Sequence, residues 1–189
     1  MLNAMRFSHQ LLEETINRFP SGLFIDATLG NGHDSYFILS NKNFKGRLLS
    51  FDIQARAILN SYQRINQLQT TSASYQFIHA SHDTLFNYLN SNSLIHGAIF
   101  NLGYLPGGNH QITTRSQSTL NALQQIMSKL VRKGRVIIVI YSGHPEGQVE
   151  KEQLLNYLKT IDQQEYHIYH YHALNQKNNP PELLAIERI

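Results

Sequence analysis

Short apolar runs alternate with stretches of helical periodicity along most of the chain, and this alternation restricts the possible folds more than any other feature. Buried strands are predicted where the apolar runs occur, at residues 22–27, 46–51, 75–80, 95–101 and 135–141. Helices are predicted at residues 7–19, 33–39, 58–65, 83–89, 120–131 and 154–161. Strand–helix–strand units form right-handed crossovers, so we expect a mainly parallel sheet with helices on both faces.

The end of the chain predicts an antiparallel strand pair. Residues 166–173 and 182–189 alternate like strands and are joined by the Asn- and Pro-rich turn 175–181. Added to the five earlier strands, they complete a seven-stranded sheet. We therefore expect an α/β, Rossmann-like fold that residues 1–189 form as a single domain, with no linker to a second one.

Composition excludes several classes of chemistry. The chain has no cysteine, which excludes disulfides, thiolate zinc ligands and a cysteine nucleophile. A net charge of +3 permits a polyanionic partner without requiring one. The N-terminus does not resemble a signal peptide and no apolar stretch is long enough to span a membrane, so we expect a cytoplasmic protein without membrane association.

The first predicted strand leads into a glycine-rich turn at the edge of the sheet where such folds bind ligands. Its candidate cofactor-binding residues are Asp26, Thr28, Gly30, Asn31, Gly32 and Asp34. Ser35 stands where a dinucleotide-binding turn has its third glycine, and the flanking carboxylates would repel a pyrophosphate but attract a sulfonium. The turn therefore favours S-adenosylmethionine over NAD, although an ordinary strand-to-helix turn has a similar composition.

Polar residues also follow the second and third strands. Asp52 is placed to accept hydrogen bonds from ribose hydroxyls, which indicates a nucleoside without saying which one. Gln54 is either an adenine or ribose contact or a solvent-facing residue of a first helical turn. Ser81 and His82 are candidates for contact with the adenine edge, while Ser81 serves equally well as a helix cap.

The fourth strand ends in Asn101-Leu-Gly-Tyr104-Leu-Pro-Gly-Gly108. An Asn side-chain oxygen there can hold an amine with its lone pair towards a methyl donor, and Tyr104 offers a stacking face for a base. His144, which follows the fifth strand, is a candidate proton acceptor. We predict catalytic roles for Asn101, Tyr104 and His144, with Asn101 also at the cofactor. The predicted substrate-binding residues are Tyr104, Pro106, Gly107, Gly108, Arg115, Tyr141 and His144.

Three histidines lie close together near the C-terminus. Strand alternation puts His170 and His172 on one face and His167 on the other. Because no acidic or cysteine ligand accompanies them at a recognisable spacing, we predict no metal site.

Taken in order, these motifs resemble one family, the small class I methyltransferases of the YtqB/MnmM type, also described as rRNA methylases. The resemblance rests on residues 27–34 (ATLGNGHD), 51–54 (FDIQ), 101–108 (NLGYLPGG) and 141–147 (YSGHPEG). It implies an S-adenosylmethionine-dependent enzyme that methylates the aminomethyl nitrogen of 5-aminomethyl-(2-thio)uridine at the wobble position of tRNA. The anticodon loop would then be the partner, and a homodimer is compatible with this fold.

The residues leave other functions open. A methyltransferase acting on rRNA or on a small-molecule amine would have the same motifs. An NAD-dependent oxidoreductase of similar fold is disfavoured by the missing third glycine. A non-catalytic nucleotide- or RNA-binding module would use the same crevice without transferring a methyl group.

Overall fold

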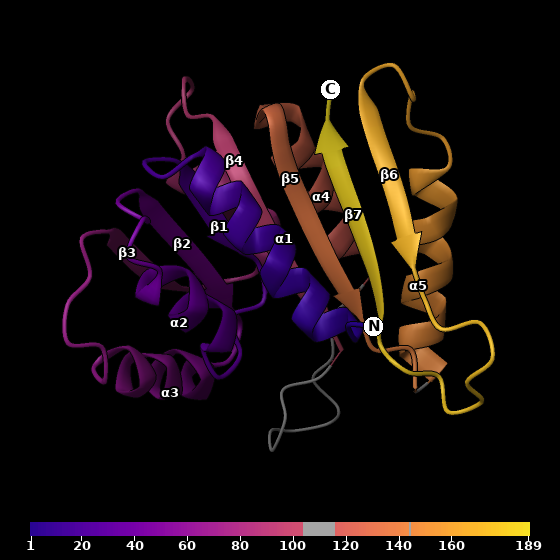
Figure 1. The fold of residues 1–189 in the computed structure, drawn as a ribbon, viewed down its shortest axis with the longest axis horizontal. Coiled ribbons are helices and arrows are strands. Elements are labelled where there is room, and N and C mark those ends of the chain that lie inside the picture. The colour runs from indigo at the N-terminus through magenta and orange to yellow at the C-terminus, as the bar shows by residue number, and fades with distance from the viewer. Residues whose placement is uncertain (104–115, 144) are drawn as a thin grey trace.

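The computed structural model describes residues 1–103, 116–143 and 145–189, and Figure 1 shows their arrangement. The helices are α1 (Ala4–Arg18), α2 (His33–Ser40), α3 (Ala55–Ile65), the 3-10 helix η1 (His82–Tyr88), α4 (Ser116–Lys129) and α5 (Pro145–Leu158). The strands are β1 (Leu23–Asp26), β2 (Arg47–Asp52), β3 (Ser74–His79), β4 (Ile95–Leu102), β5 (Leu130–Ile140), β6 (Tyr166–Tyr171) and β7 (Glu182–Arg188). None of the helices in this part of the chain is long and apolar enough to cross a membrane.

The seven strands of the described residues form one sheet in the order β3-β2-β1-β4-β5-β7-β6. Strands β1 to β5 pair in parallel, and β7 is antiparallel to both of its neighbours. Because β1 lies between β2 and β4, the chain changes direction across the sheet at β1, and the carboxyl ends of these strands meet at one edge. The predicted α/β fold with a C-terminal antiparallel pair is confirmed.

Strand β5 shows why the sheet is covered on both faces. Val136, Ile138 and Ile140 belong to one hydrophobic cluster, whereas Ile137 and Val139 belong to the other, since successive side chains point to opposite faces. The first cluster includes apolar residues of η1, α4 and α5, and the second includes those of α1, α2 and α3. In Figure 1, α1 crosses in front of the sheet while α4 and α5 lie behind it.

The structure differs from the sequence prediction most clearly in three elements. The helix predicted at residues 154–161 is α5, which begins at Pro145 and ends at Leu158. The predicted helix at residues 83–89 is a 3-10 helix, and the Gln125 side chain bonds its backbone at Phe86 N–H and at the Asp83 carbonyl. The Asp83 carbonyl and Phe86 N–H are three residues apart, the spacing of a 3-10 bond, and Gln125 bonds both groups from outside the helix. The fifth strand begins at Leu130 rather than residue 135, because Leu130 already pairs with Ile95 of β4. The register shifts before Arg135, and Lys133 in this irregular stretch takes a positive φ of 66°.

Candidate active site

The turn between β1 and α2 is held in shape by two left-handed glycines and by contacts from α3. Gly30 and Gly32 have φ of 51° and 75°. A Cβ on Gly32 would lie 2.7 Å from Ser61 Oγ and 3.0 Å from Ser61 Cα, so the helix packs against the turn only because this residue lacks a side chain. Ser61 Oγ donates to the Gly30 carbonyl at 3.1 Å, and Arg64 Nε donates to the Asn31 carbonyl at 2.7 Å.

Asp52 fastens the same turn to the end of β2. Its carboxylate accepts from Gly30 N–H at 2.9 Å and from Gln54 N–H at 2.8 Å. Burial raises the pKa of this carboxyl, and the two backbone donors oppose that effect. Ile53, which the sequence analysis did not single out, is 53% exposed directly after it. An acidic group and an apolar surface therefore stand side by side at this edge of the sheet.

Asp26 lies deeper than the sequence suggested. Its side chain is fully buried; one oxygen accepts from Ser35 Oγ at 2.7 Å and the other from Thr28 N–H at 3.2 Å. Burial, followed by the negative charge of Asp34, raises the pKa of Asp26 to about 7. The negative charge that the sequence predicted for Asp26 and Asp34 together is therefore smaller near neutral pH.

His82 presents a lone pair at the site. Its Nδ1 lies 2.9 Å from the Ala27 carbonyl, which can only accept, so Nδ1 carries the proton. Burial lowers the pKa of this imidazole and keeps it neutral. Nε2 is then an acceptor, and it has no hydrogen-bond partner among the described residues although it is buried. Ser81 next to it occupies the N-cap of η1 but makes no side-chain cap bond.

Asn101, on β4, has the same kind of unmatched atom. Its backbone N–H donates to Thr28 Oγ1 at 2.6 Å, and its side-chain Nδ2 donates to Asp34 Oδ2. A carboxylate accepts but does not donate, and this fixes which end of the amide faces Asp34. The carbonyl oxygen Oδ1 consequently points elsewhere, buried and without a partner in the part of the chain that the structure describes.

Two further residues surround Asp34. His9 of α1 lies with Nε2 at 2.7 Å from Asp34 Oδ1. Tyr141 follows β5, and burial together with the negative charge of Asp34 raises the pKa of its phenol, which stays protonated. The fold thus brings Asp34, Asn101 and Tyr141 together from three separate parts of the chain, and adds His9. Nothing in the apolar spacing of the first helix pointed to His9.

The other predicted substrate residues cannot be placed in this arrangement. Tyr104, Pro106, Gly107, Gly108, Arg115 and His144 lie outside the described residues. The predicted roles of the site residues as a whole stay predictions.

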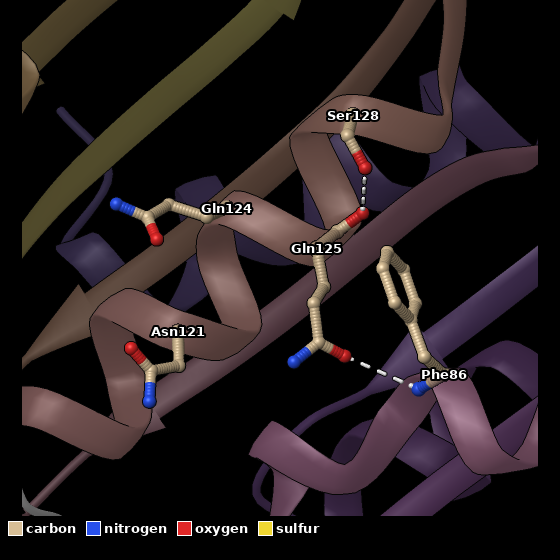
Figure 2. Close-up of a pocket in the computed structure, with 5 residues that line it drawn as sticks. All are labelled: Phe86, Asn121, Gln124, Gln125 and Ser128. Atoms are coloured by element: carbon tan, nitrogen blue, oxygen red, sulfur yellow. Dashed lines mark hydrogen bonds between the residues drawn. The ribbon is translucent and has the colours of Figure 1, made fainter.

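A surface hollow of about 370 Å³ lies apart from this site, between η1 and α4. Figure 2 shows its lining residues, Phe86, Asn121, Gln124, Gln125 and Ser128. The Gln125 side chain bonds η1 there, and Ser128 Oγ donates to the backbone carbonyl of Gln125 at 2.8 Å. No predicted site residue within the described part of the chain lines this hollow, and the Gln125 side chain joins the two helices there.

The histidine cluster is arranged as strand alternation predicts. The rings of His170 and His172 lie 4.7 Å apart, and His170 Nε2 lies 2.7 Å from Glu182 Oε2. Within residues 1–103, 116–143 and 145–189, no group of three or more His, Cys, Asp or Glu side chains is placed to hold a metal ion.

The sheet order with an antiparallel β7, the glycine turn after β1 and the acid after β2 together define a class I methyltransferase. Residues 48–187 match the family model described as "Putative rRNA methylase". The chain belongs to this family of class I, S-adenosylmethionine-dependent methyltransferases. The predicted family and cofactor are confirmed.

Solved structures of similar chains cover the whole molecule. A "putative rRNA-methylase" from Clostridium thermocellum has 36% identity and a TM-score of 0.89, covering 100% of this chain and 99% of that one. SMU.1697c, a "putative methyltransferase" from Streptococcus mutans in complex with SAH, has 34% identity and a TM-score of 0.88 over the same shares of the two chains.

A relative with a curated name is the chloroplastic tRNA (mnm(5)s(2)U34)-methyltransferase of Arabidopsis thaliana. It is 31% identical over 156 residues, which make up 79% of this chain and 56% of the relative. The chain therefore spans little more than half the length of that relative.

Proposed function

We propose that the chain methylates the aminomethyl nitrogen of 5-aminomethyl-(2-thio)uridine at the wobble position of tRNA. The observation that carries the proposal is the Asn101 side chain, whose Nδ2 is held by Asp34 while Oδ1 is buried without a partner among the described residues. A buried acceptor without a donor costs free energy, on the order of 1–3 kcal/mol. An amine N–H of the substrate supplies that donor.

The cofactor pocket we propose consists of the turn and the two neighbouring strand ends. Asp52 accepts from ribose hydroxyls, and Ile53 packs against the adenine ring. The neutral Nε2 of His82 is an acceptor, which matches the 6-amino group of adenine. Gly30 has no side chain to keep the methionine part away from the backbone, and the fully buried Asp26 holds the turn through Thr28 N–H. When bound, S-adenosylmethionine supplies an electrophilic methyl group on a positively charged sulfur.

The residues around Asn101 prepare the amine for attack. Asn101 Oδ1 accepts one N–H and thereby fixes the direction of the nitrogen lone pair. Asp34 and the protonated Tyr141 are polar, largely buried groups next to the Asn101 side chain. No cysteine is present to attack uracil C6, and this absence favours nitrogen over carbon as the acceptor. Excess proton passes to water or to His144.

RNA as the substrate is supported by the name of the Arabidopsis relative, which specifies a tRNA uridine. A wobble base already lies in a loop, so turning it into a pocket costs less than extracting it from a duplex. The net charge of +3 is compatible with an RNA partner. The family description names rRNA instead, and rRNA is therefore the second candidate substrate.

The test is a methylation assay with S-adenosylmethionine and tRNA carrying 5-aminomethyl-2-thiouridine, read by nucleoside mass spectrometry. We expect one added methyl on that nucleoside and none on rRNA or on tRNA lacking the aminomethyl group. Asn101→Ala should lower kcat by about 100-fold, because the amine is no longer oriented. Asn156→Ala, an exposed position on α5, is the matched control and should retain full activity.

Calorimetric titration separates the remaining alternatives. The proposal requires binding of S-adenosylmethionine and no measurable binding of NAD. Binding of the cofactor without methyl transfer to any RNA or amine would instead support a non-catalytic module, and methylation of rRNA alone would replace the proposed substrate.

A further inference from the structure

Helix α1 carries a histidine to the carboxyl edge of the sheet. The helix is amphipathic, with Leu12 and Ile16 fully buried against the sheet. Its start is anchored where Phe7 meets the Tyr171 ring edge-on at 5.1 Å and the Tyr171 hydroxyl donates to the Leu2 carbonyl at 2.6 Å. Figure 1 shows the N-terminus beside the carboxyl end of β5. The first half of α1 therefore lies on the side where the site is built.

The His9 ring has a defined position there. It stacks on Phe37 with ring centroids 4.1 Å apart and an interplanar angle of 19°. Its Nε2 lies 2.7 Å from Asp34 Oδ1, and because the carboxylate only accepts, Nε2–H donates. The side chains of His9 and Asp34 are 28% and 8% exposed, so this bond is largely shielded from water.

Asp34 connects His9 to Asn101. One carboxylate oxygen accepts from His9 and the other from Asn101 Nδ2, so donors on both sides fix the rotation of the carboxylate. The carboxylate in turn selects the amide orientation that leaves Asn101 Oδ1 without a partner in the described chain. Removing His9 would free one carboxylate oxygen and allow both side chains to turn.

We propose that His9 is a positioning residue that acts through Asp34 to aim Asn101 Oδ1 at the acceptor amine. This inference rests on the proposed function, since it assigns Asn101 to the amine. His9 does not itself touch the reacting atoms. Its contribution is to hold the amide in a single orientation before the substrate arrives.

A pair of substitutions separates the hydrogen bond from the shape of the ring. His9→Phe keeps a ring to stack on Phe37 but removes the donor, whereas His9→Gln keeps an N–H donor and loses the ring. We expect His9→Phe to lower kcat by about 10- to 100-fold while the dissociation constant of S-adenosylmethionine changes by less than about threefold. His9→Gln should recover most of that loss. His167→Phe, at an exposed position on β6, is the matched control and should behave as wild type.

Three results would overturn the inference. Unchanged kcat in His9→Phe would mean that the bond is not needed. Equal losses in His9→Phe and His9→Gln would mean that activity does not follow the presence of the N–H donor. A parallel loss of cofactor affinity would assign His9 to the cofactor pocket instead.

A measurement without catalysis keeps this test apart from the proposed function. Hydrogen exchange of the Asn101 side-chain amide, followed by NMR of ¹⁵N-labelled protein, should accelerate at least tenfold in His9→Phe and not in His167→Phe. Unchanged exchange contradicts the role of His9 whatever the substrate is. Faster exchange in a protein that methylates no amine would retain the role of His9 in holding Asn101 and reject the proposed function alone.

Discussion

Replacing Gly32 by alanine tests whether the cofactor turn depends on close packing against α3. Gly32 has φ 75° and ψ 22°, and an L-residue in this left-handed region costs about 1–2 kcal/mol. The new Cβ would lie 2.9 Å from Ser61 Cβ and 3.0 Å from Ser61 Cα, contacts that a rotation of the Ser61 hydroxyl does not relieve. Overpacking of a buried site adds about 1–3 kcal/mol.

The combined loss of stability should be about 2–4 kcal/mol, of which the reduced entropy of the unfolded chain offsets less than about 1 kcal/mol. For a chain of this size, that loss lowers Tm by roughly 5–15 °C. Displacement of α3 also strains the bond from Ser61 Oγ to the Gly30 carbonyl, so affinity for S-adenosylmethionine should fall by about tenfold.

Thermal and urea unfolding measure the first effect, and calorimetric titration with S-adenosylhomocysteine measures the second. Gly143→Ala is the control for stability, because an added Cβ there would have no atom within 4 Å. The reasoning is refuted if Gly32→Ala melts within about 2 °C of wild type, since the turn would then accept a side chain and the close approach would have no energetic meaning.

Three other substitutions probe separate parts of the structure. Burial raises the pKa of Asp26 from 3.8 to about 7, so the free energy of unfolding of the wild type should fall as pH rises across that window, by up to about 1.4 kcal/mol per pH unit. Asp26→Asn should flatten this slope in urea unfolding. Gln125→Ala should cost about 1–3 kcal/mol in denaturant unfolding, because two backbone groups of η1 lose their partner, and unchanged stability would argue against this link. Arg135→Leu should lower the free energy of unfolding by about 1–3 kcal/mol, because Glu187 and Glu14 lose their ion pairs with Arg135 at 2.8 and 2.7 Å. This loss should shrink at acidic pH, where the two carboxylates become protonated.

Strand ends could be predicted because polar residues in a parallel sheet gather where the strands finish. Asp52 and Asn101 were predicted on that ground, and the sheet order brings their strands to either side of β1. Asp26 was predicted to carry a full negative charge beside the glycine turn, and its burial makes that charge smaller near neutral pH. Whether a carboxyl is ionised depends on its burial and on its neighbours, and neither is written in the local sequence.

His9 marks the opposite limit. It stands 25 residues before Asp34, which in turn stands 67 residues before Asn101, and no short-range pattern relates these three positions. Helical spacing described the buried face of α1 and left His9 as one polar residue among several. The irregular start of β5 was missed for a related reason, since it depends on pairing with β4.

The sequence by itself determined the order of strands and helices, the antiparallel end of the sheet and the glycine turn, because hydrophobic periodicity and backbone freedom are local properties. Only the tertiary structure decided which amide and carboxyl atoms meet, which of them remain without a partner among the described residues, and how far burial shifts their protonation. These depend on packing between elements distant in the chain, and α1 can bring His9 to Asp34 only after the sheet has formed beneath it.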